Sequence, residues 1–115
     1  MQQSSIVIDV TLDETRIPQE IQWKASENNE GVPNKAKALL LSFWDGPEQT
    51  ALRMDLWTKE MRVDEMADFY FQTMMTMADS FERATHQKEL VEEMKKFASA
   101  FYKKFQQAHV KENKI

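Results

Sequence analysis

The chain has 115 residues, of which 42% are hydrophobic and 30% are charged, and it contains no cysteine. This length and balance are typical of one soluble globular domain, and the missing thiols exclude disulfides and a thiolate zinc site. The net charge of −4 argues against a nucleic-acid partner, because affinity for phosphate comes from an excess of lysine and arginine. We therefore expect a single cytoplasmic domain over residues 1–115, with no secretory signal and no membrane-inserted segment.

The first half of the chain alternates apolar and polar residues with a period of two, which indicates strands. Segment 6–12, IVIDVTL, places all of its apolar side chains except Val7 on one face, and segment 18–25, PQEIQWKA, places Ile21 and Trp23 on one face. The run 38–44, ALLLSFW, is apolar at nearly every position, as expected of a strand that is covered on both faces. Segment 51–57, ALRMDLW, alternates again after an Asp-Gly-Pro-Glu turn. Four strands within residues 5–57 predict an antiparallel meander, because their connections are short.

The hydrophobic period changes to that of a helix after the last strand. The helical part of the chain contains neither glycine nor proline, so one long helix has to be compared with two. On a helical wheel, the apolar stripe of residues 66–81 and that of residues 90–105 differ by well over about a third of a turn. This shift predicts a break near 85–88. We therefore expect an α+β fold of the order ββββαα, in which helices at about 64–84 and 88–108 pack on one face of the sheet and the tail frays.

The second face of the predicted sheet is the candidate binding surface. The helices are expected to cover the face that carries Phe43, which would make this ring part of the core. The opposite face presents two tryptophans, a leucine and an Arg–Asp pair, a composition typical of aromatic anchors with a satisfied polar edge. Apolar residues left over on the first helix extend the set. The candidate partner-binding residues are Leu40, Trp44, Arg53, Asp55, Trp57, Phe69 and Met75. The alternative is that the loop from Ser26 to Asn34, or the tail, folds over the tryptophans.

No residue pattern points to catalysis. Gly31 and Gly46 are isolated, so there is no phosphate-binding loop, and no serine lies in a nucleophile-elbow context. A metal site is the alternative for one helical face, because four side chains would line up on a continuous helix: Glu82, His86, Glu89 and Glu93. The predicted helix break favours a solvated polar hinge instead. We therefore expect neither enzymatic activity nor a cofactor.

Two charged clusters are interpreted as helix features rather than sites. Acidic residues at 64–68 are interpreted as the start of the first helix, with Asp64 as its N-cap, because negative charge stabilises that end of a helix. The lysines between 95 and 104 lie close to Glu92 and Glu93, which is typical of a solvated helix face.

Four segments follow one another in an order and spacing that belong to a known family: SIVIDVTLDE, ALLLSFWD, LRMDLWTKEMRVDEM and FYFQTMMTMADSFERAT. From about Ser5 to Phe105 the chain resembles the gliding motility-associated GldC proteins, and LWTKEMRVDEM and ADSFERAT are the most specific segments. His86 stands where the family leads us to expect a glycine after FERAT. The resemblance implies an accessory role in the machinery that moves gliding bacteria over surfaces, which is linked to a dedicated protein-secretion system. It supplies no catalytic residue.

Two classes of function remain to be compared. The first is a non-enzymatic, cytoplasmic protein-interaction module that binds a protein of the motility or secretion machinery, or a second copy of the chain. The second is a small-ligand-binding protein or enzyme whose pocket lies between the sheet and the first helix, lined by Trp23, Tyr70 and Met74. Aromatic and methionine residues at helical spacing are usually core, which favours the first class.

Overall fold

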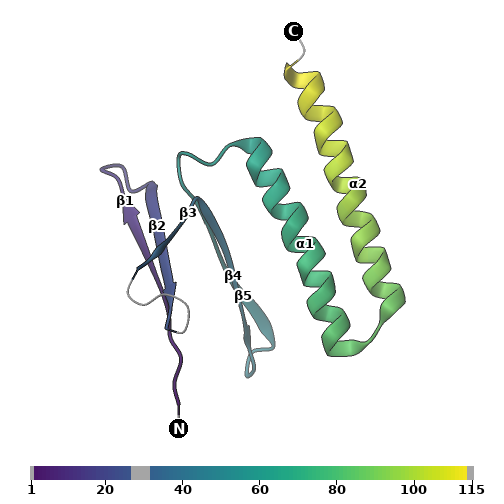
Figure 1. Cartoon of the computed structure of the whole chain (residues 1–115), viewed down its shortest axis with the longest axis horizontal. Coiled ribbons are helices and arrows are strands. Elements are labelled where there is room, and N and C mark those ends of the chain that lie inside the picture. Colours follow the sequence, from purple (N-terminus) through teal and green to yellow (C-terminus); the bar gives the residue numbers. More distant parts are fainter. Residues whose placement is uncertain (1, 27–31, 114–115) are drawn as a thin grey trace. The chain divides into compact units, whose positions relative to one another are not determined.

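A computed structural model describes residues 2–26 and 32–113 of the chain (Figure 1). The chain forms two compact units, Met1–Met61 and Arg62–Ile115, and each unit is described by itself. In the first unit, strands β1 (Ile6–Leu12), β2 (Pro18–Ala25) and β3 (Asn34–Ala36) form one antiparallel sheet, and β4 (Ala38–Asp45) and β5 (Thr50–Trp57) form an antiparallel ribbon. In the second unit, helices α1 (Val63–Thr85) and α2 (Lys88–Asn113) form a hairpin.

The three-stranded sheet has one apolar and one polar face, as the alternation predicts. The register pairs Val10 with Ile21, and Ile21 with Ala36 on the third strand. Ile21 is 1% exposed, and it lies on the central strand between these two apolar neighbours. On the polar face, Lys35 forms an ion pair with Glu20 at an N–O distance of 3.8 Å.

Asp13 organises the turn between β1 and β2. Its carboxylate accepts hydrogen bonds from the backbone N–H of Thr15 and of Ile17, at 2.8 and 3.0 Å, and one from the Thr15 hydroxyl. It also forms an ion pair with Lys59, which follows β5 along the chain. The Lys59 ammonium and these hydrogen bonds hold the pKa of Asp13 well below its usual range. The turn is therefore tied to the segment that leaves the ribbon.

The structure corrects the predicted four-stranded meander. The predicted third strand forms as β4, but an additional short strand, β3, lies before it; β3 pairs with β2, while β4 pairs with β5 in a separate sheet. The Lys37 carbonyl accepts hydrogen bonds from both the backbone N–H and the hydroxyl of Thr58, each at 2.8 Å. Thr58 is buried, so this pair of bonds fixes the bend from inside the unit. The apolar run starts only at Ala38, and the short β3 before it carries no such signal.

The start of α1 differs from the prediction as well. The N-cap residue is Arg62, whose backbone is extended, and Asp64 lies inside the first turn. Glu65 reaches back and accepts a hydrogen bond from the Arg62 backbone N–H at 3.1 Å. The Asp64 carboxylate instead holds the Arg62 guanidinium, with Nε–Oδ1 and Nη2–Oδ2 distances of 2.9 and 3.2 Å. Both acids favour the positive end of the helix, as expected, but the capping contact comes from Glu65.

The helices are separate, as the shift of the apolar stripe predicts. Helix α1 ends at Thr85, and His86 follows it in the left-handed conformation with φ 59° and ψ 25°. The backbone N–H of His86 still donates to the Glu82 carbonyl at 2.8 Å. This is the arrangement in which most helices carry glycine, because a side chain clashes with the left-handed backbone. Helix α2 begins two residues later, at Lys88.

Small side chains form the seam between α1 and α2. The buried residues of the hairpin are Ala67, Ala78, Val91 and Ala98. The three alanines let the two helix backbones approach closely, because no long side chain separates them at these positions. At one end of the seam, Phe71 packs on Tyr102 with ring centroids 4.9 Å apart.

An ion pair links α1 and α2 along one side of the seam. The Asp79 carboxylate and the Lys95 ammonium lie 2.8 Å apart, and this hydrogen bond raises the pKa of Lys95. The large apolar side chains of the hairpin lie on the other side.

Most of the predicted loop from Ser26 to Asn34, namely residues 27–31, lies outside the described residues, as do residues 114 and 115 of the tail. Asn34 itself begins β3.

Candidate interaction surfaces

The ribbon of β4 and β5 sorts its side chains onto two faces. Its register pairs Leu40 with Asp55, and Ser42 with Arg53. Directly paired residues project to the same side of a sheet, and every second residue along each strand joins them. The tryptophan face of the ribbon carries Ala38, Leu40, Ser42, Trp44, Ala51, Arg53, Asp55 and Trp57. The candidate residues that the sequence placed on these strands therefore share one face, as predicted.

The aromatic side chains of the tryptophan face are unusually exposed to solvent. Trp44 is 69% exposed and Trp57 is 53% exposed, whereas tryptophan is on average a highly buried residue. The Arg–Asp pair expected to satisfy the polar edge is not formed. Arg53 and Asp55, which both lie in the described part of the chain, make no ion pair with each other. Two residues apart on one strand, they remain available to a partner.

The opposite face of the ribbon is apolar except at the turn end, where Asp45 pairs with Thr50. It carries Leu39, Leu41, Phe43, Leu52, Met54 and Leu56. Phe43 was expected in the core, but its ring is 59% exposed, and Leu52 and Met54 are more than half exposed. A two-stranded ribbon buries little by itself, because each side chain meets only its cross-strand and diagonal neighbours. Phe43 is therefore a surface residue of this ribbon.

The remaining candidate residues, Phe69 and Met75, lie on α1. Phe69 contacts the neighbouring Tyr70 ring edge-on, with centroids 6.4 Å apart, and both Phe69 and Met75 are half-buried. They belong to the helical unit, whereas the tryptophan face belongs to the ribbon. Their part in binding stays a prediction.

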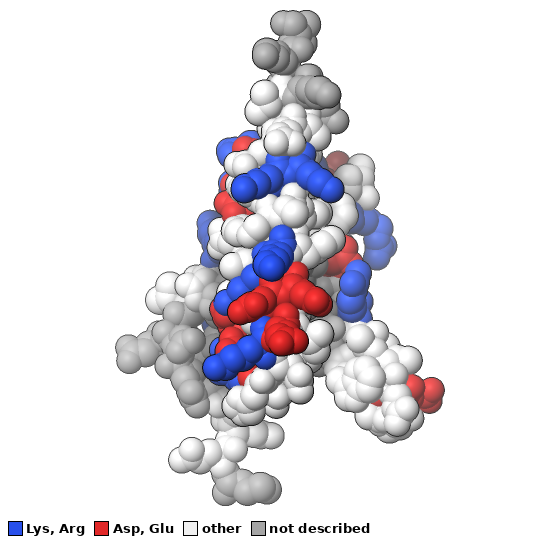
Figure 2. All heavy atoms as spheres, turned by 90° about the vertical axis from the view of Figure 1, so that its right-hand side faces the viewer, with Lys and Arg blue, Asp and Glu red and all other residues white. Residues whose placement is uncertain are grey.

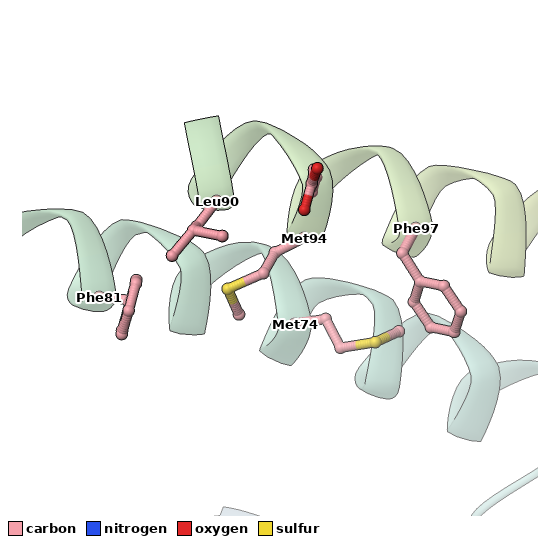
Figure 3. Close-up of a pocket in the computed structure, with 6 residues that line it drawn as sticks. Met74, Phe81, Leu90, Met94 and Phe97 are labelled. Carbon is pink, nitrogen blue, oxygen red and sulfur yellow. The ribbon is translucent and has the colours of Figure 1, made fainter. Parts of the chain in front are cut away.

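The helical hairpin contains a groove that the sequence did not indicate as a site. The helical groove has a volume of about 470 Å³. It is lined by Met74 and Phe81 from α1 and by Leu90, Glu93, Met94 and Phe97 from α2 (Figure 3). Met74 had been assigned to a ligand pocket with Trp23 and Tyr70, and the structure places it in this groove. Glu93 is the one charged side chain in the lining.

The signal for the groove was present in the helical wheel but was interpreted as core. The apolar arc of α1 is wider than one packing partner needs. The alanines at the seam take up part of that contact without large side chains. Consequently, the large side chains beside the seam form the walls of an open groove instead of a closed core.

A second hollow of about 420 Å³ lies in the first unit and is polar. Its lining residues are Gln19, Glu20, Lys35, Ala36, Lys37, Thr58 and Glu60. Lysines and glutamates oppose each other across it, and the ion pair between Lys35 and Glu20 belongs to its wall. This polar hollow places hydrogen-bonding side chains beside the bend at Lys37.

The alternative metal site required a continuous helix through His86. The left-handed backbone at His86 ends α1, so Glu82 and Glu89 lie on different helices. Within residues 2–26 and 32–113, no three histidine, aspartate or glutamate side chains come together in a way that would hold a metal ion.

Charged side chains on the face drawn in Figure 2 are mixed in sign. Figure 2 shows lysines and arginines lying next to aspartates and glutamates instead of forming one positive patch. This matches the interpretation of the late lysines as a solvated helix face.

In the described part of the chain, no helix is both long enough and apolar enough to cross a bilayer. Comparison with curated proteins and with solved structures found no match. A family model described as gliding motility-associated protein GldC-like matches residues 18–107. This range includes β2 to β5, all of α1 and most of α2. The chain therefore belongs to the gliding motility-associated GldC-like family.

Proposed function

We propose that this GldC-like protein is a non-enzymatic accessory component of the gliding machinery and its associated secretion system. It acts in the cytoplasm as a small protein-interaction module, and the tryptophan face of the ribbon holds its protein partner. The observation that carries this proposal is the exposure of Trp44 and Trp57 on one face of a two-stranded ribbon. Exposed aromatic side chains on a rigid backbone are the usual anchors of protein interfaces.

The polar residues of the tryptophan face support the same proposal. Arg53 and Asp55 lie between the two tryptophans in the register, opposite Ser42 and Leu40. An arginine beside exposed aromatic rings is enriched at interfaces, because its guanidinium both stacks and forms hydrogen bonds. A partner that offers a carboxylate to Arg53 and an N–H donor to Asp55 would satisfy both charges.

The test compares two aromatic residues that are adjacent in sequence and lie on opposite faces. Trp44→Ala should lower the stability by less than about 1 kcal/mol, because the ring is already exposed. It should nevertheless remove about 2 kcal/mol or more of binding, which is roughly a thirtyfold loss of affinity. Phe43→Ala is the matched control, since it removes an aromatic ring of similar exposure from the apolar face.

The assay is an affinity capture from a gliding host, with the full chain as bait and quantification by mass spectrometry. Wild type and Phe43→Ala should capture the same protein of the gliding or secretion machinery, and Trp44→Ala and Trp57→Ala should lose it. Surface spreading of the host should fall in the same two variants. Equal capture by all four proteins would contradict the proposal, as would an equal loss in the Phe43 and Trp44 variants.

A further inference from the structure

The helical hairpin has a second surface whose properties point to a different occupant. The residues that face one another across the seam are mostly alanines, and the large side chains lie to one side of it. On α2 these side chains recur at Leu90, Met94, Phe97 and Phe101, a spacing of four, three and four residues. This is the spacing by which helices pack in bundles. On the other side of the seam lies the ion pair of Asp79 and Lys95. The hairpin is thus apolar on one side and polar on the other.

We propose that the helical groove is an interface between two copies of this chain, in which the hairpins pack antiparallel as a four-helix bundle. This inference concerns the helical unit and goes beyond the proposed role of the tryptophan face. Two observations carry it, the area of the apolar side of the hairpin and the distribution of charge along α2.

The exposed apolar area matches that of a stable dimer. The large apolar side chains on this side are between 37% and 64% exposed, and they are Tyr70, Met77, Phe81, Leu90 and Phe97. Side chains of this size have roughly 150–250 Å² of surface each, so together they leave about 500 Å² uncovered. A specific interface buries about 800 Å² per partner, of which about 65% is apolar in homodimers. The two areas agree.

The charges select a second copy in the antiparallel direction. Glu93 lines the helical groove, and Lys104 lies three turns further along the same side of α2. A two-fold axis that passes between residues 98 and 99 brings Glu93 of each copy opposite Lys104 of the other. The same axis brings the Phe97 rings close together. Phe97 is the most exposed ring of the groove and stacks on Phe101 at a centroid distance of 6.3 Å.

The test is the oligomeric state of the full chain, measured by sedimentation equilibrium over a range of concentrations. Wild type should be a dimer. Glu93→Lys and Lys104→Glu should each weaken the dimer about tenfold or more, because either change turns two attractive pairs into repulsive ones. The double variant should recover most of the affinity. Glu93 and Lys104 are three turns apart on one helix, so this rescue cannot arise within one copy.

Glu92→Lys is the matched control, since it makes the same change of charge one residue away on the polar side of α2. Its dimer affinity should stay within about twofold of wild type. Circular dichroism checks that every variant keeps its helices. A wild-type chain that remains monomeric at all concentrations would overturn the inference. A double variant no better than the single ones would do so as well, since the charges would then not face each other.

Discussion

Replacement of His86 by glycine is expected to stabilise the protein. His86 follows α1 with a φ of 59°, in the left-handed region that side chains disfavour. The left-handed backbone costs a residue with a Cβ roughly 1–2 kcal/mol, and glycine avoids this cost. Glycine also makes the unfolded chain more flexible, which takes back roughly 0.4–1 kcal/mol. The free energy of unfolding should therefore rise by about 0.5–1 kcal/mol.

The gain is measurable because nothing else at this position changes. The hydrogen bond from the His86 N–H to the Glu82 carbonyl uses the backbone alone and is kept in the glycine variant. The imidazole is exposed, and within the described residues no hydrogen bond to it is formed. For a chain of this size, a gain of this magnitude corresponds to a rise in Tm of roughly 2–6 °C.

Two controls separate strain from other effects of glycine. His86→Ala removes the imidazole but keeps the Cβ, so it should leave the stability unchanged or slightly lower. Ala84→Gly places glycine in the last turn of α1, where the backbone is helical, and should lower the stability by about 1 kcal/mol. Urea unfolding of the three variants gives the comparison. If His86→Gly destabilised the chain as Ala84→Gly does, the left-handed residue would carry no strain and the reasoning would be wrong.

Two further predictions concern the hairpin seam and the turn between β1 and β2. Ala98→Leu should lower the free energy of unfolding by about 1–3 kcal/mol because the buried seam has no room for a larger side chain, whereas Ala100→Leu on the exposed side should change it by less than about 0.5 kcal/mol. If urea unfolding ranked the two variants in the opposite order, the close packing around Ala98 would be contradicted. The lowered pKa of Asp13 adds stability above its usual value of 3.8, and this contribution is lost as the pH falls through the lower, folded-state pKa. Asp13→Asn should therefore lose less stability than wild type as the pH falls from neutral to well below 3.8, and equal losses would show that the contacts of the Asp13 carboxylate do not stabilise the fold.

The features that could be predicted from the sequence are those with a strong period. The shift of the apolar stripe located the break that the structure places at His86, and the alternation along β4 and β5 assigned each side chain to its face. Both signals depend on backbone geometry alone. A helix of fixed pitch cannot shift its stripe without a break, and a strand cannot turn one residue over without a bulge.

The features that could not be predicted depend on single contacts. The bend between the additional strand β3 and β4 is fixed by Thr58, which donates a hydrogen bond to the Lys37 carbonyl, a contact between residues 21 positions apart. The helix cap depends on whether Glu65 or Asp64 reaches the right N–H, which composition does not decide. The helical groove was missed because large apolar residues at helical spacing usually indicate core. The alanines that form the seam give only a weak hydrophobic signal on a helical wheel.

The pairing of neighbouring elements has a consequence for the kinetics of folding. The strongest pairings join β1 to β2, β2 to β3, β4 to β5 and α1 to α2, so each links elements that follow one another along the chain. Contacts between near neighbours form fast, because little chain entropy is lost before they are made. Synthesis proceeds at roughly 5–20 residues per second, so the first unit leaves the ribosome seconds before the helices do. During those seconds the nascent ribbon presents both of its exposed faces to any chaperone or partner at the ribosome exit.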